Sequence, residues 1–555
     1  MNKFNIRQFH IRLLLLPFLV LFFMGSKFGD DDDIYDKINK NMDIFGKVYK
    51  EIALNYVDEI DADKFIKAGI EGMLSTLDPY TVFIDEDQMS EIDLITLGKY
   101  AGIGITVGLR ESMITITEVM NGYEAQRKGL RVGDKILAVN GTDLSNVELK
   151  NFRNYVRGPA GTSLEMKVQR NGNFIYFDLT REEIILKNVS YSGFIGDEAE
   201  GIAYFKLDRF TTNAENEVEN VLKTLKSQVE LRGVIIDLRD NTGGLLDAAI
   251  GILNKFVDKN NLLLITKGKD KDSEKKYFSK EDPLVPKDVP LVVLVNKNTA
   301  SASEIVAGAI QDLDRGVIIG SKSFGKGLVQ NIKELSSDSK LKITSSRYYT
   351  PSGRWIQEKD YFRENKYGVF IDKNSFSQQE FKTLGGRTVY ANGGITPDIE
   401  IDIAPESEIH MALLDRDMFF KFTDYYLEQN PGIKTFVCTD EVLEQFRDFL
   451  RTSNFDYVSH ADKDIDDLKK IASEKDYSIE FIDYLDKIAV EISIKEESEF
   501  EKAKDELKRS IETEMNKRII TEKEQIEATF PQDIQLQDAI RIIKDRVEYN
   551  SLLGK

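Results

Sequence analysis

The sequence predicts a multidomain α/β protein whose central domain is built on a parallel β-sheet. Three apolar runs, at residues 233–238, 291–295 and 316–320, have the length and composition of strands that are buried on both faces. Residues 301–313 lie between the last two runs and carry apolar side chains at helical spacing. A strand, a helix and a strand in this order form a βαβ unit, in which the two strands are parallel. The chain has 555 residues, which is too long for one ordinary domain.

The first 29 residues have the order of charges and apolar residues that is typical of an export signal. Three basic residues precede a run of 12 apolar residues, 13–24, and an acidic segment follows. This run is too short to cross a bilayer, which takes about 20 residues. The sequence therefore predicts export to the periplasm. An uncleaved anchor in the inner membrane is the alternative, because Gly25 and Ser26 form a poor cleavage site.

Residues 30–95 are expected to form a small helical domain. Ile38, Met42 and Phe45 belong to a set of apolar residues that recur every three or four positions. This pattern stops at Pro79, which disfavours the helical conformation of the residue before it.

Residues 96–184 combine short strands, glycines and one helix. Residues 133–141 (GDKILAVNG) read as a strand that enters an Asn-Gly turn, and a second Asn-Gly pair at 171–172 joins two further strands as a hairpin. Ser145 and Glu148 fit a capping box at the start of the helix. This order resembles a PDZ domain. The resemblance implies that the terminal carboxylate of a peptide is held by backbone N–H groups of Gly102, Ile103, Gly104 and Ile105.

The composition excludes several classes of protein. A formal charge of −20 argues against a nucleic-acid partner, because phosphate binding requires a basic surface. The single cysteine, Cys438, leaves no disulfide framework and no Cys/His zinc cluster, and we expect no metal or organic cofactor. No histidine occurs between His10 and His410, so a serine nucleophile in that interval needs a different base.

Residues that could carry nucleophilic chemistry lie in two stretches, 298–304 (NTASASE) and 320–330 (GSKSFGKGLVQ). Ser301 is expected where a strand meets a helix, and the N–H groups of the first helical turn favour a developing negative charge there. Lys326 is the candidate base. Its pKa would have to fall from about 10.4 to about 7–8, which destabilises the ammonium by about 3–5 kcal/mol. Ser301 and Glu304 also fit a capping box, so a purely structural N-cap is the alternative interpretation of this serine.

The two stretches resemble the active-site region of the carboxy-terminal processing peptidases, also called tail-specific proteases. Residues 237–244 (DLRDNTGG) match this family as well, and the resemblance covers residues 40–403. It implies a crotonase/ClpP-like protease core with an inserted PDZ domain. The implied catalytic residues are Ser301 as nucleophile, Lys326 as general base and Gln330 as the group that orients the lysine. The implied oxyanion hole consists of backbone N–H groups of Ala302 and of Gly243 or Gly244.

Arg157 follows the PDZ helix. It resembles an arginine that, in some members of the family, links the substrate-bound PDZ domain to the protease core. The alternative is an ordinary helix-terminal arginine, because a cation is stabilised near the negative end of the helix dipole.

The sequence thus predicts an exported serine endopeptidase that captures the C-terminal tail of a protein in its PDZ groove and cleaves it through acylation of Ser301. The expected partners are proteins or peptides with exposed C-termini, and a membrane anchor and a homo-oligomer are further expectations. A catalytically inert PDZ adaptor or holdase and a small-substrate esterase or acyl transferase remain as alternatives. The expected segments are a signal peptide or membrane anchor at 1–29, a helical N-terminal domain at 30–95, a PDZ domain at 96–184, a serine peptidase core at 185–404 and a helical C-terminal accessory domain at 405–555.

Overall fold

The computed structural model describes residues 31–85, 88–110, 112–170, 172–359, 361, 379–391, 393–402, 405–453, 455, 460–475 and 477–555. The predicted export segment, residues 1–29, lies outside the described residues. Among the helices that are described, none has the length and apolar character that crossing a membrane requires. The chain divides into two units, of which the smaller consists of residues 1–83, 332–343 and 361–373.

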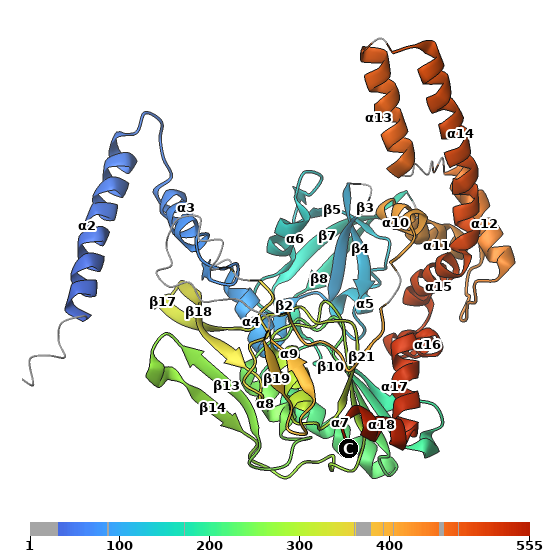
Figure 1. Ribbon diagram of the computed structural model, residues 1–555. Coiled ribbons are helices and arrows are strands. Elements are labelled where there is room, and N and C mark those ends of the chain that lie inside the picture. Colours follow the sequence, from blue (N-terminus) through green and yellow to red (C-terminus); the bar gives the residue numbers. More distant parts are fainter. Residues whose placement is uncertain are drawn as a thin grey trace, which may run out of the picture. The chain divides into compact units, whose positions relative to one another are not determined.

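The smaller unit contains the helices α2 (Asp31–Asn55) and α3 (Ala62–Leu74), shown in blue in Figure 1. The rings of Tyr49 on α2 and Phe65 on α3 stack with their centroids 5.8 Å apart. The hydroxyl of Tyr49 also donates to the carbonyl of Ala62. These contacts hold the two helices together.

In the larger unit, the region that resembles a PDZ domain forms a six-stranded antiparallel sheet. The strand order is β3-β4-β5-β7-β8, with β6 beside β5, so β3 stands at one end of the order. The strands are β3 (Ile105–Arg110), β4 (Met113–Val119), β5 (Lys135–Val139), β6 (Thr142–Asp143), β7 (Ser163–Arg170) and β8 (Asn173–Thr180). The helices of this region are α5 (Glu124–Lys128) and α6 (Leu149–Val156).

Helix α6 begins later than the predicted capping box requires. Glu148 is the N-cap residue and makes no side-chain cap, so the expected box of Ser145 and Glu148 is wrong. The reason is a local turn, in which the N–H of Ser145 donates to the Asp143 carboxylate at 2.7 Å. Phe152 and Val156 are buried in the core of this domain, as their helical spacing predicts.

A two-stranded antiparallel ribbon connects the PDZ sheet to the rest of the unit. Its strands are β2 (Lys99–Gly102), which leads into the loop before β3, and β9 (Glu182–Ile185), which follows β8. The strand that leads into the PDZ sheet is therefore paired with the strand that leaves it. Helix α4 (Met89–Leu97) precedes β2.

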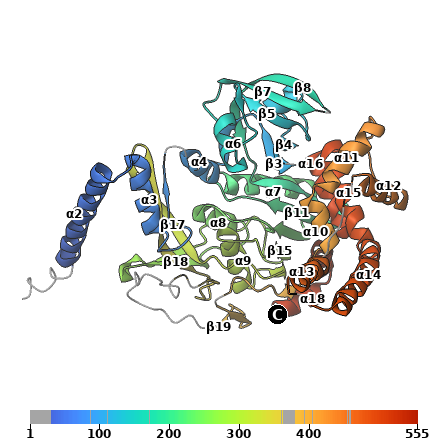
Figure 2. The ribbon, with the colours of Figure 1, turned by 90° about the horizontal axis from the view of Figure 1, so that it is seen from above.

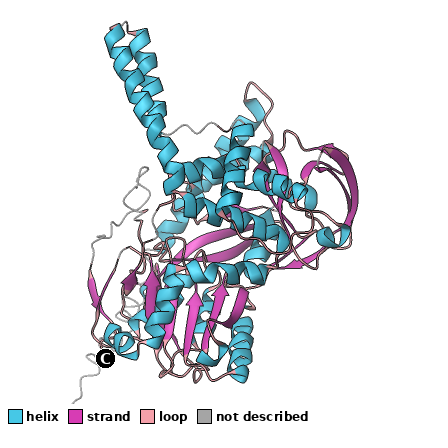
Figure 3. Cartoon of the chain, turned by 90° about the vertical axis from the view of Figure 1, so that its right-hand side faces the viewer, coloured by secondary structure: helices cyan, strands magenta, loops and turns pink. Residues whose placement is uncertain are grey.

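The central sheet has the strand order β10-β11-β12-β15-β16-β21. All neighbours are parallel except β10 and β11. The three apolar runs of the sequence form the adjacent strands β12, β15 and β16, and α9 connects the last two, which confirms the predicted βαβ unit. Figure 3 shows the strands in magenta among the helices in cyan. The bounds are β10 (Val189–Phe194), β11 (Ile202–Leu207), β12 (Gly233–Asp237), β15 (Leu291–Val295), α9 (Ala302–Asp312), β16 (Val317–Gly320) and β21 (Ile399–Glu400).

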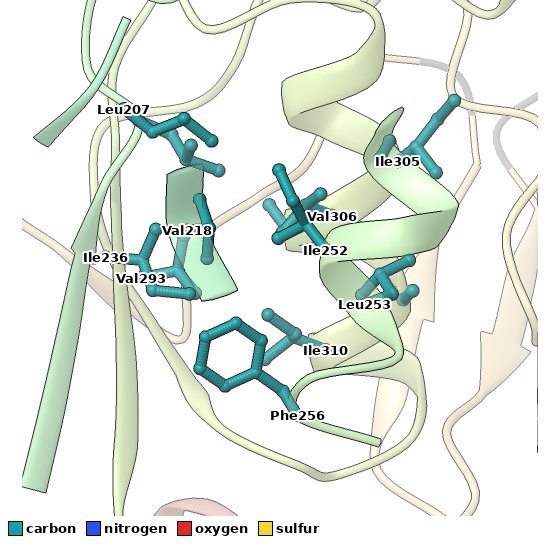
Figure 4. Packing of buried hydrophobic residues seen from close by; sticks show 14 of the residues in the cluster. Leu207, Val218, Ile236, Ile252, Leu253, Phe256, Val293, Ile305, Val306 and Ile310 are labelled. Carbon is teal, nitrogen blue, oxygen red and sulfur yellow. The ribbon is translucent and has the colours of Figure 1, made fainter. Parts of the chain in front are cut away.

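One face of the central sheet packs against α7 (Ala214–Gln228), α8 (Leu246–Leu253) and α9. Figure 4 shows Leu207, Ile236 and Val293 of the sheet facing Val306 and Ile310 of α9. These side chains are fully buried, which explains why the strands have no polar alternation.

The opposite face of the sheet is covered by helices from the end of the chain, α17 (Ile534–Lys544) and α18 (Arg546–Leu552). Ile543 packs so closely on Gly233 that a Cβ at this glycine would collide with it. The hydroxyl of Tyr549 accepts a hydrogen bond from the N–H of Leu291 at 2.9 Å. The sequence grouped these helices with the accessory region, whereas in the structure they form a layer of the protease core.

Replacing Ile543 by alanine should lower the free energy of unfolding by about 2–4 kcal/mol, because it leaves a cavity between α17 and the central sheet. Ile534→Ala is the matched control, since this residue of the same helix is 68% exposed. Urea unfolding of both variants measures the difference. Equal stability of the two variants would contradict the packing of α17 on the sheet.

The helices between residues 408 and 519 surround two smaller cores of their own, and the helix at 522–529 packs against β10 of the central sheet. Helices α13 and α14 run side by side as a hairpin, seen in both Figure 1 and Figure 2. The bounds are α10 (Glu408–Asp415), α11 (Met418–Gln429), α12 (Asp440–Thr452), α13 (His460–Glu474), α14 (Ile479–Lys502), α15 (Lys504–Ile519) and α16 (Glu522–Thr529).

Further strands lie outside the central sheet. A five-stranded sheet has the order β1-β18-β13-β14, with β17 beside β18, and β19 pairs with β20. The bounds are β1 (Val82–Ile84), β13 (Leu262–Gly268), β14 (Lys275–Phe278), β17 (Leu328–Ser336), β18 (Ser339–Tyr349), β19 (Glu380–Lys382) and β20 (Thr388–Tyr390).

Candidate active site

Ser301 occupies a strained turn directly before α9. Its backbone has φ 57° and ψ −116°, a conformation that is rare for residues with a side chain and costs about 1–3 kcal/mol. Glu304 makes its half of the predicted capping box, because its side chain accepts a hydrogen bond from the N–H of Ser301. The carbonyl of Ser301 accepts a hydrogen bond from the hydroxyl of Tyr348 at 3.2 Å. The turn thus places Ser301 at the amino end of a buried helix, where developing negative charge is stabilised.

Glu304 is fully buried and joins the Ser301 turn to the loop of Lys326. One carboxylate oxygen accepts hydrogen bonds from the Ser323 hydroxyl at 2.6 Å and the Gly325 N–H at 2.7 Å. The other accepts from the N–H groups of Ser301 at 2.8 Å and Lys326 at 2.9 Å. The backbone nitrogens of Ser301 and Lys326 are therefore no further apart than the sum of these two distances. Burial raises the pKa of Glu304, and its hydrogen bonds oppose that rise.

The loop that carries Lys326, between β16 and β17, is also held by hydrogen bonds at Gly327, the residue after the lysine. The N–H of Gly327 donates to the side chain of Gln357 at 2.7 Å, and its carbonyl accepts from the indole N–H of Trp355 at 2.9 Å. Lys326 itself is partly buried. Gln330 lies on β17, where its side-chain amide donates to the Thr344 hydroxyl at 3.1 Å. This hydrogen bond fixes the orientation of the amide.

Gly243, in the loop after β12, lies against the Ser301 turn. A Cβ at this position would be 2.8 Å from the nitrogen of Ala302 and 2.9 Å from the Cβ of Ser301, and φ is +97°. The N–H of Gly243 donates to the Asn241 side chain at 2.8 Å. Within the described part of the chain, neither Ala302 nor Gly244 donates its backbone N–H to a protein acceptor. These two N–H groups are available to an oxyanion.

Asn241 is a residue of this loop that sequence reasoning did not single out. It is 1% exposed, and its amide donates to the carbonyl of Leu207 at 2.6 Å. The backbone carbonyl of Asn241 accepts hydrogen bonds from the N–H of Ala300 and from the hydroxyl of Ser303, both at 3.0 Å. Asn241 thus fixes the glycine loop and the Ser301 turn to each other.

Gly243→Ala should lower kcat by a factor of about 10², because the added Cβ pushes the glycine loop away from Ser301 and Ala302. Gly386→Ala is the control for backbone strain alone, since Gly386 has φ +91° and open space around it. Steady-state kinetics on one substrate compares them. A Gly243→Ala enzyme as active as the control would show that the loop is not part of the site.

The residues expected to bind a peptide carboxylate lie together in the PDZ domain, at the start of β3. Gly102 ends β2, and Ile105 begins β3. The carbonyls of Ile103 and Gly104 accept hydrogen bonds from the N–H groups of Ala125 and Met120. Because β3 stands at the end of the sheet order, an extended peptide could add to it as a further strand.

Arg157 is the C-cap residue of α6. Its guanidinium lies over the ring of Tyr100 on β2, 4.8 Å from the centroid. Burial lowers the pKa of Arg157. The structure therefore places this arginine against the ribbon that connects the PDZ sheet to the core.

A histidine and the cysteine, two residue types that can act as a base or a nucleophile, are buried in the region after residue 405. His410 is buried on α10, with Nε2 2.6 Å from the Ser510 hydroxyl. Cys438 is buried, and burial raises the pKa of its thiol to about 12. A thiol with this pKa is protonated at neutral pH and is a poor nucleophile.

Family models match most of the chain. The matches are Peptidase family S41 at residues 201–364, PDZ domain at 92–169, Activating protease CtpB N-terminal domain at 26–88 and Probable PDZ-protease, C-terminal helical domain at 409–543.

Several curated proteins and solved structures are similar to the chain. A carboxy-terminal-processing protease of Bartonella bacilliformis is 35% identical over 57% of this chain and 73% of its own length. The carboxy-terminal processing protease CtpB of Bacillus subtilis is 32% identical over 58% of this chain and 66% of its own. The structure of the photosystem II D1 C-terminal processing protease covers 64% of this chain and 92% of its own, with 25% identity and a TM-score of 0.36.

The matched models and the two curated relatives define a serine protease with a PDZ domain. The chain belongs to the carboxy-terminal processing peptidases of peptidase family S41. An inert adaptor and a small-substrate esterase are not favoured.

Proposed function

We propose that the protein cleaves the exposed C-terminal tails of proteins by nucleophilic attack of Ser301, with Lys326 as the base. The observation that supports this most directly is the sharing of one Glu304 oxygen by the N–H groups of Ser301 and Lys326. It brings a strained serine turn and a lysine loop together in a stretch without histidine.

In the proposed reaction the neutral amine of Lys326 accepts the proton of the Ser301 hydroxyl as its oxygen attacks the peptide carbonyl. The N–H groups of Ala302 and Gly244 stabilise the oxyanion. The ammonium of Lys326 then protonates the leaving amine, and the acyl-enzyme forms. In the second half, water attacks the ester while the same amine takes its proton; the C–O bond to Ser301 then breaks, the ammonium returns the proton to the serine oxygen, and the carboxylic acid product leaves. Gln330 orients the lysine.

The PDZ domain supplies the tail specificity in this proposal. A terminal carboxylate would be held at residues 102–105, and the tail would extend along β3. Capture of the tail raises the local concentration of the nearby peptide bond at Ser301. Flexible tails are therefore preferred over folded segments.

We also propose that the protein is exported to the periplasm, supported by the basic residues and the short apolar run that follows them in residues 1–29. Anchoring in the inner membrane and assembly into a homo-oligomer are further parts of this proposal. Cell fractionation with and without residues 1–29 tests the export, since a cytoplasmic location of the full-length chain contradicts it.

The test of the function combines a phosphonyl fluoride probe with a small folded protein that carries a ten-residue unstructured tail. The wild type should become labelled and should shorten the tail, and Ser301→Ala should do neither. Ser321→Ala is the control, since this serine directly follows β16, its N–H bonds to Val295 at the end of β15, and it has no part in the proposed mechanism. Absence of labelling and of cleavage in the wild type supports the inert adaptor. Hydrolysis of short esters without tail cleavage supports the esterase.

A further inference from the structure

Arg239 lies in the glycine loop, residues 238–244 after β12, and its side chain bonds to the start of α17. Nη1 and Nη2 of Arg239 donate to the two carboxylate oxygens of Asp533 at 2.9 and 2.6 Å. Nη1 also donates to the side-chain oxygen of Gln535 at 3.1 Å. The side chain of Arg239 is 15% exposed, so salt and water screen this pair weakly. A helix near the end of the chain thus holds the loop that contains the proposed oxyanion donors.

The acceptors that bind Arg239 on α17 are themselves fixed. Asp533 is the N-cap residue of this helix and accepts a hydrogen bond from the N–H of Leu536 at 3.0 Å. Gln535 is 1% exposed, and its amide donates to the carbonyl of Ile401 at 2.9 Å. Because α17 packs on the central sheet, both acceptors belong to the folded core.

Arg239 also bonds to Asp237, the last residue of β12. Nε donates to Oδ1 at 3.0 Å, Nη2 donates to Oδ2 at 2.6 Å, and the backbone N–H of Arg239 donates to Oδ1 at 2.9 Å. The hydroxyl of Tyr204 on β11 donates to the same carboxylate at 2.9 Å. Asp237 is 1% exposed, so its charge requires these partners. One guanidinium therefore joins the end of β12 to α17.

The residue after Arg239 holds the segment that leads to Ser301. The carboxylate of Asp240 accepts hydrogen bonds from the side-chain amides of Asn296 and Asn298 at 2.9 and 2.8 Å. Asp240 has φ +64°, a conformation that a residue with a side chain keeps only where its surroundings impose it. The ion pairs of Arg239 fix the loop on one side of this strained residue, and the two asparagines fix it on the other.

We propose that Asp533 positions the glycine loop for catalysis through Arg239. The ion pair keeps the N–H of Gly244 where it can bond to an oxyanion formed at Ser301. This inference rests on the proposed function, because that function assigns Gly244 to the oxyanion hole. Asp533 and Arg239 are positioning residues, since neither touches the substrate. Asp533 lies outside residues 201–364, which match peptidase family S41, so a residue beyond this match contributes to the geometry of the site.

Asp533→Asn tests the ion pair and keeps a helix cap. Asparagine caps a helix about as well as aspartate does, but it is uncharged and has one acceptor oxygen where the carboxylate has two. The matched control is Asp545→Asn at the exposed N-cap of α18, where the carboxylate accepts from the N–H groups of Val547 and Glu548. The control makes the same chemical change at a helix start without breaking the bond to Arg239.

Arg239→Lys is a second, independent variant. A lysine keeps the positive charge but cannot bond to two carboxylates through a planar fork, so the loop loses its connection to Asp533. The double variant with both substitutions tests whether the two residues act as one unit. If they do, the double variant should lose no more activity than either single variant.

The rate at which a phosphonyl fluoride modifies Ser301 of the full-length chain reports the position of the glycine loop. In this reaction the serine oxygen bonds to phosphorus, fluoride leaves and Lys326 takes the serine proton. The developing negative charge on the phosphonyl oxygen depends on the N–H of Gly244. The plateau of the rate against pH measures this stabilisation, whereas the midpoint of the profile measures the ionisation of Lys326.

The plateau rate constant should fall by about tenfold in Asp533→Asn, in Arg239→Lys and in the double variant, because the glycine loop is displaced in all three. The midpoint should stay that of the wild type, since Lys326 lies on a different loop. Asp545→Asn should match the wild type in both quantities. The amount of label bound at completion and the thermal unfolding midpoint are measured beside the rate, because unfolding lowers these two, whereas a displaced loop lowers the rate constant.

The inference is overturned if folded Asp533→Asn reacts as fast as the wild type, or if Asp545→Asn is slowed equally. It is also overturned if the double variant is slower by about a hundredfold, since the two residues would then act independently. If Asp533→Asn does not fold, Arg239→Lys decides by the same comparison. A wild type that is not labelled at Ser301 overturns the proposed function instead, and this inference with it.

Discussion

Replacing Lys326 by alanine should lower kcat by a factor of about 10⁴ and leave the affinity for tail peptides unchanged. Without the amine, the Ser301 hydroxyl keeps its proton at neutral pH and attacks the peptide bond poorly. The PDZ loop at residues 102–105 is separate from the lysine loop, so binding through it should persist. Steady-state kinetics and fluorescence anisotropy with a labelled peptide measure the two effects.

Lys322→Ala is the matched control for this prediction. Lys322 lies in the same loop, is exposed and pairs with Glu358 at 3.5 Å. Loss of an exposed ion pair changes stability by at most about 1 kcal/mol, so activity should stay close to that of the wild type. Residual activity above a few per cent in Lys326→Ala would remove the lysine from the mechanism.

Glu304→Gln should lower kcat by a factor of about 10³ with little change in KM. A glutamine can present only one acceptor oxygen where the carboxylate presents two, so two of the four donors lose their partner. A buried donor without an acceptor costs about 1–3 kcal/mol, and the variant should also be less stable by about 2–4 kcal/mol. Kinetics at 10 °C below the melting midpoint separates the loss of geometry from unfolding.

The control for Glu304→Gln is Glu358→Gln, an exposed glutamate beside the same loop. It makes the same chemical change without burying an unpaired donor. An equal loss of kcat in both variants would mean that charge near the loop, rather than the position of Ser301 and Lys326, is what Glu304 provides.

Much of the core could be predicted from the sequence because its signals are local. Strands β12, β15 and β16 are runs of apolar residues, and α9 has its apolar residues at helical spacing, so their type and order follow without tertiary information. The order of strands and turns in the PDZ domain could also be predicted, because its two Asn-Gly pairs mark tight turns. The start of α6 was not, because Asp143 competes for the N–H of Ser145.

The remaining features depend on contacts between distant residues. The pattern of α17 predicts an apolar face at Leu536, Ala539 and Ile543, but not that this face covers the central sheet. Glu304 fits a local capping box, and nothing local indicates that Lys326, 22 residues later, bonds to the same oxygen. Asn241 bonds through its side chain to Leu207 and through its backbone carbonyl to Ser303, and no local pattern predicts these contacts.

The most direct test is the pH dependence of the rate at which a phosphonyl fluoride modifies Ser301. If Lys326 is the neutral base, the rate should rise with a single ionisation whose midpoint lies at about pH 7–8 and should reach a plateau above it. In Lys326→Ala this ionisation should be absent. A midpoint near the ordinary lysine pKa of about 10.4, or the same profile in the alanine variant, would contradict the account.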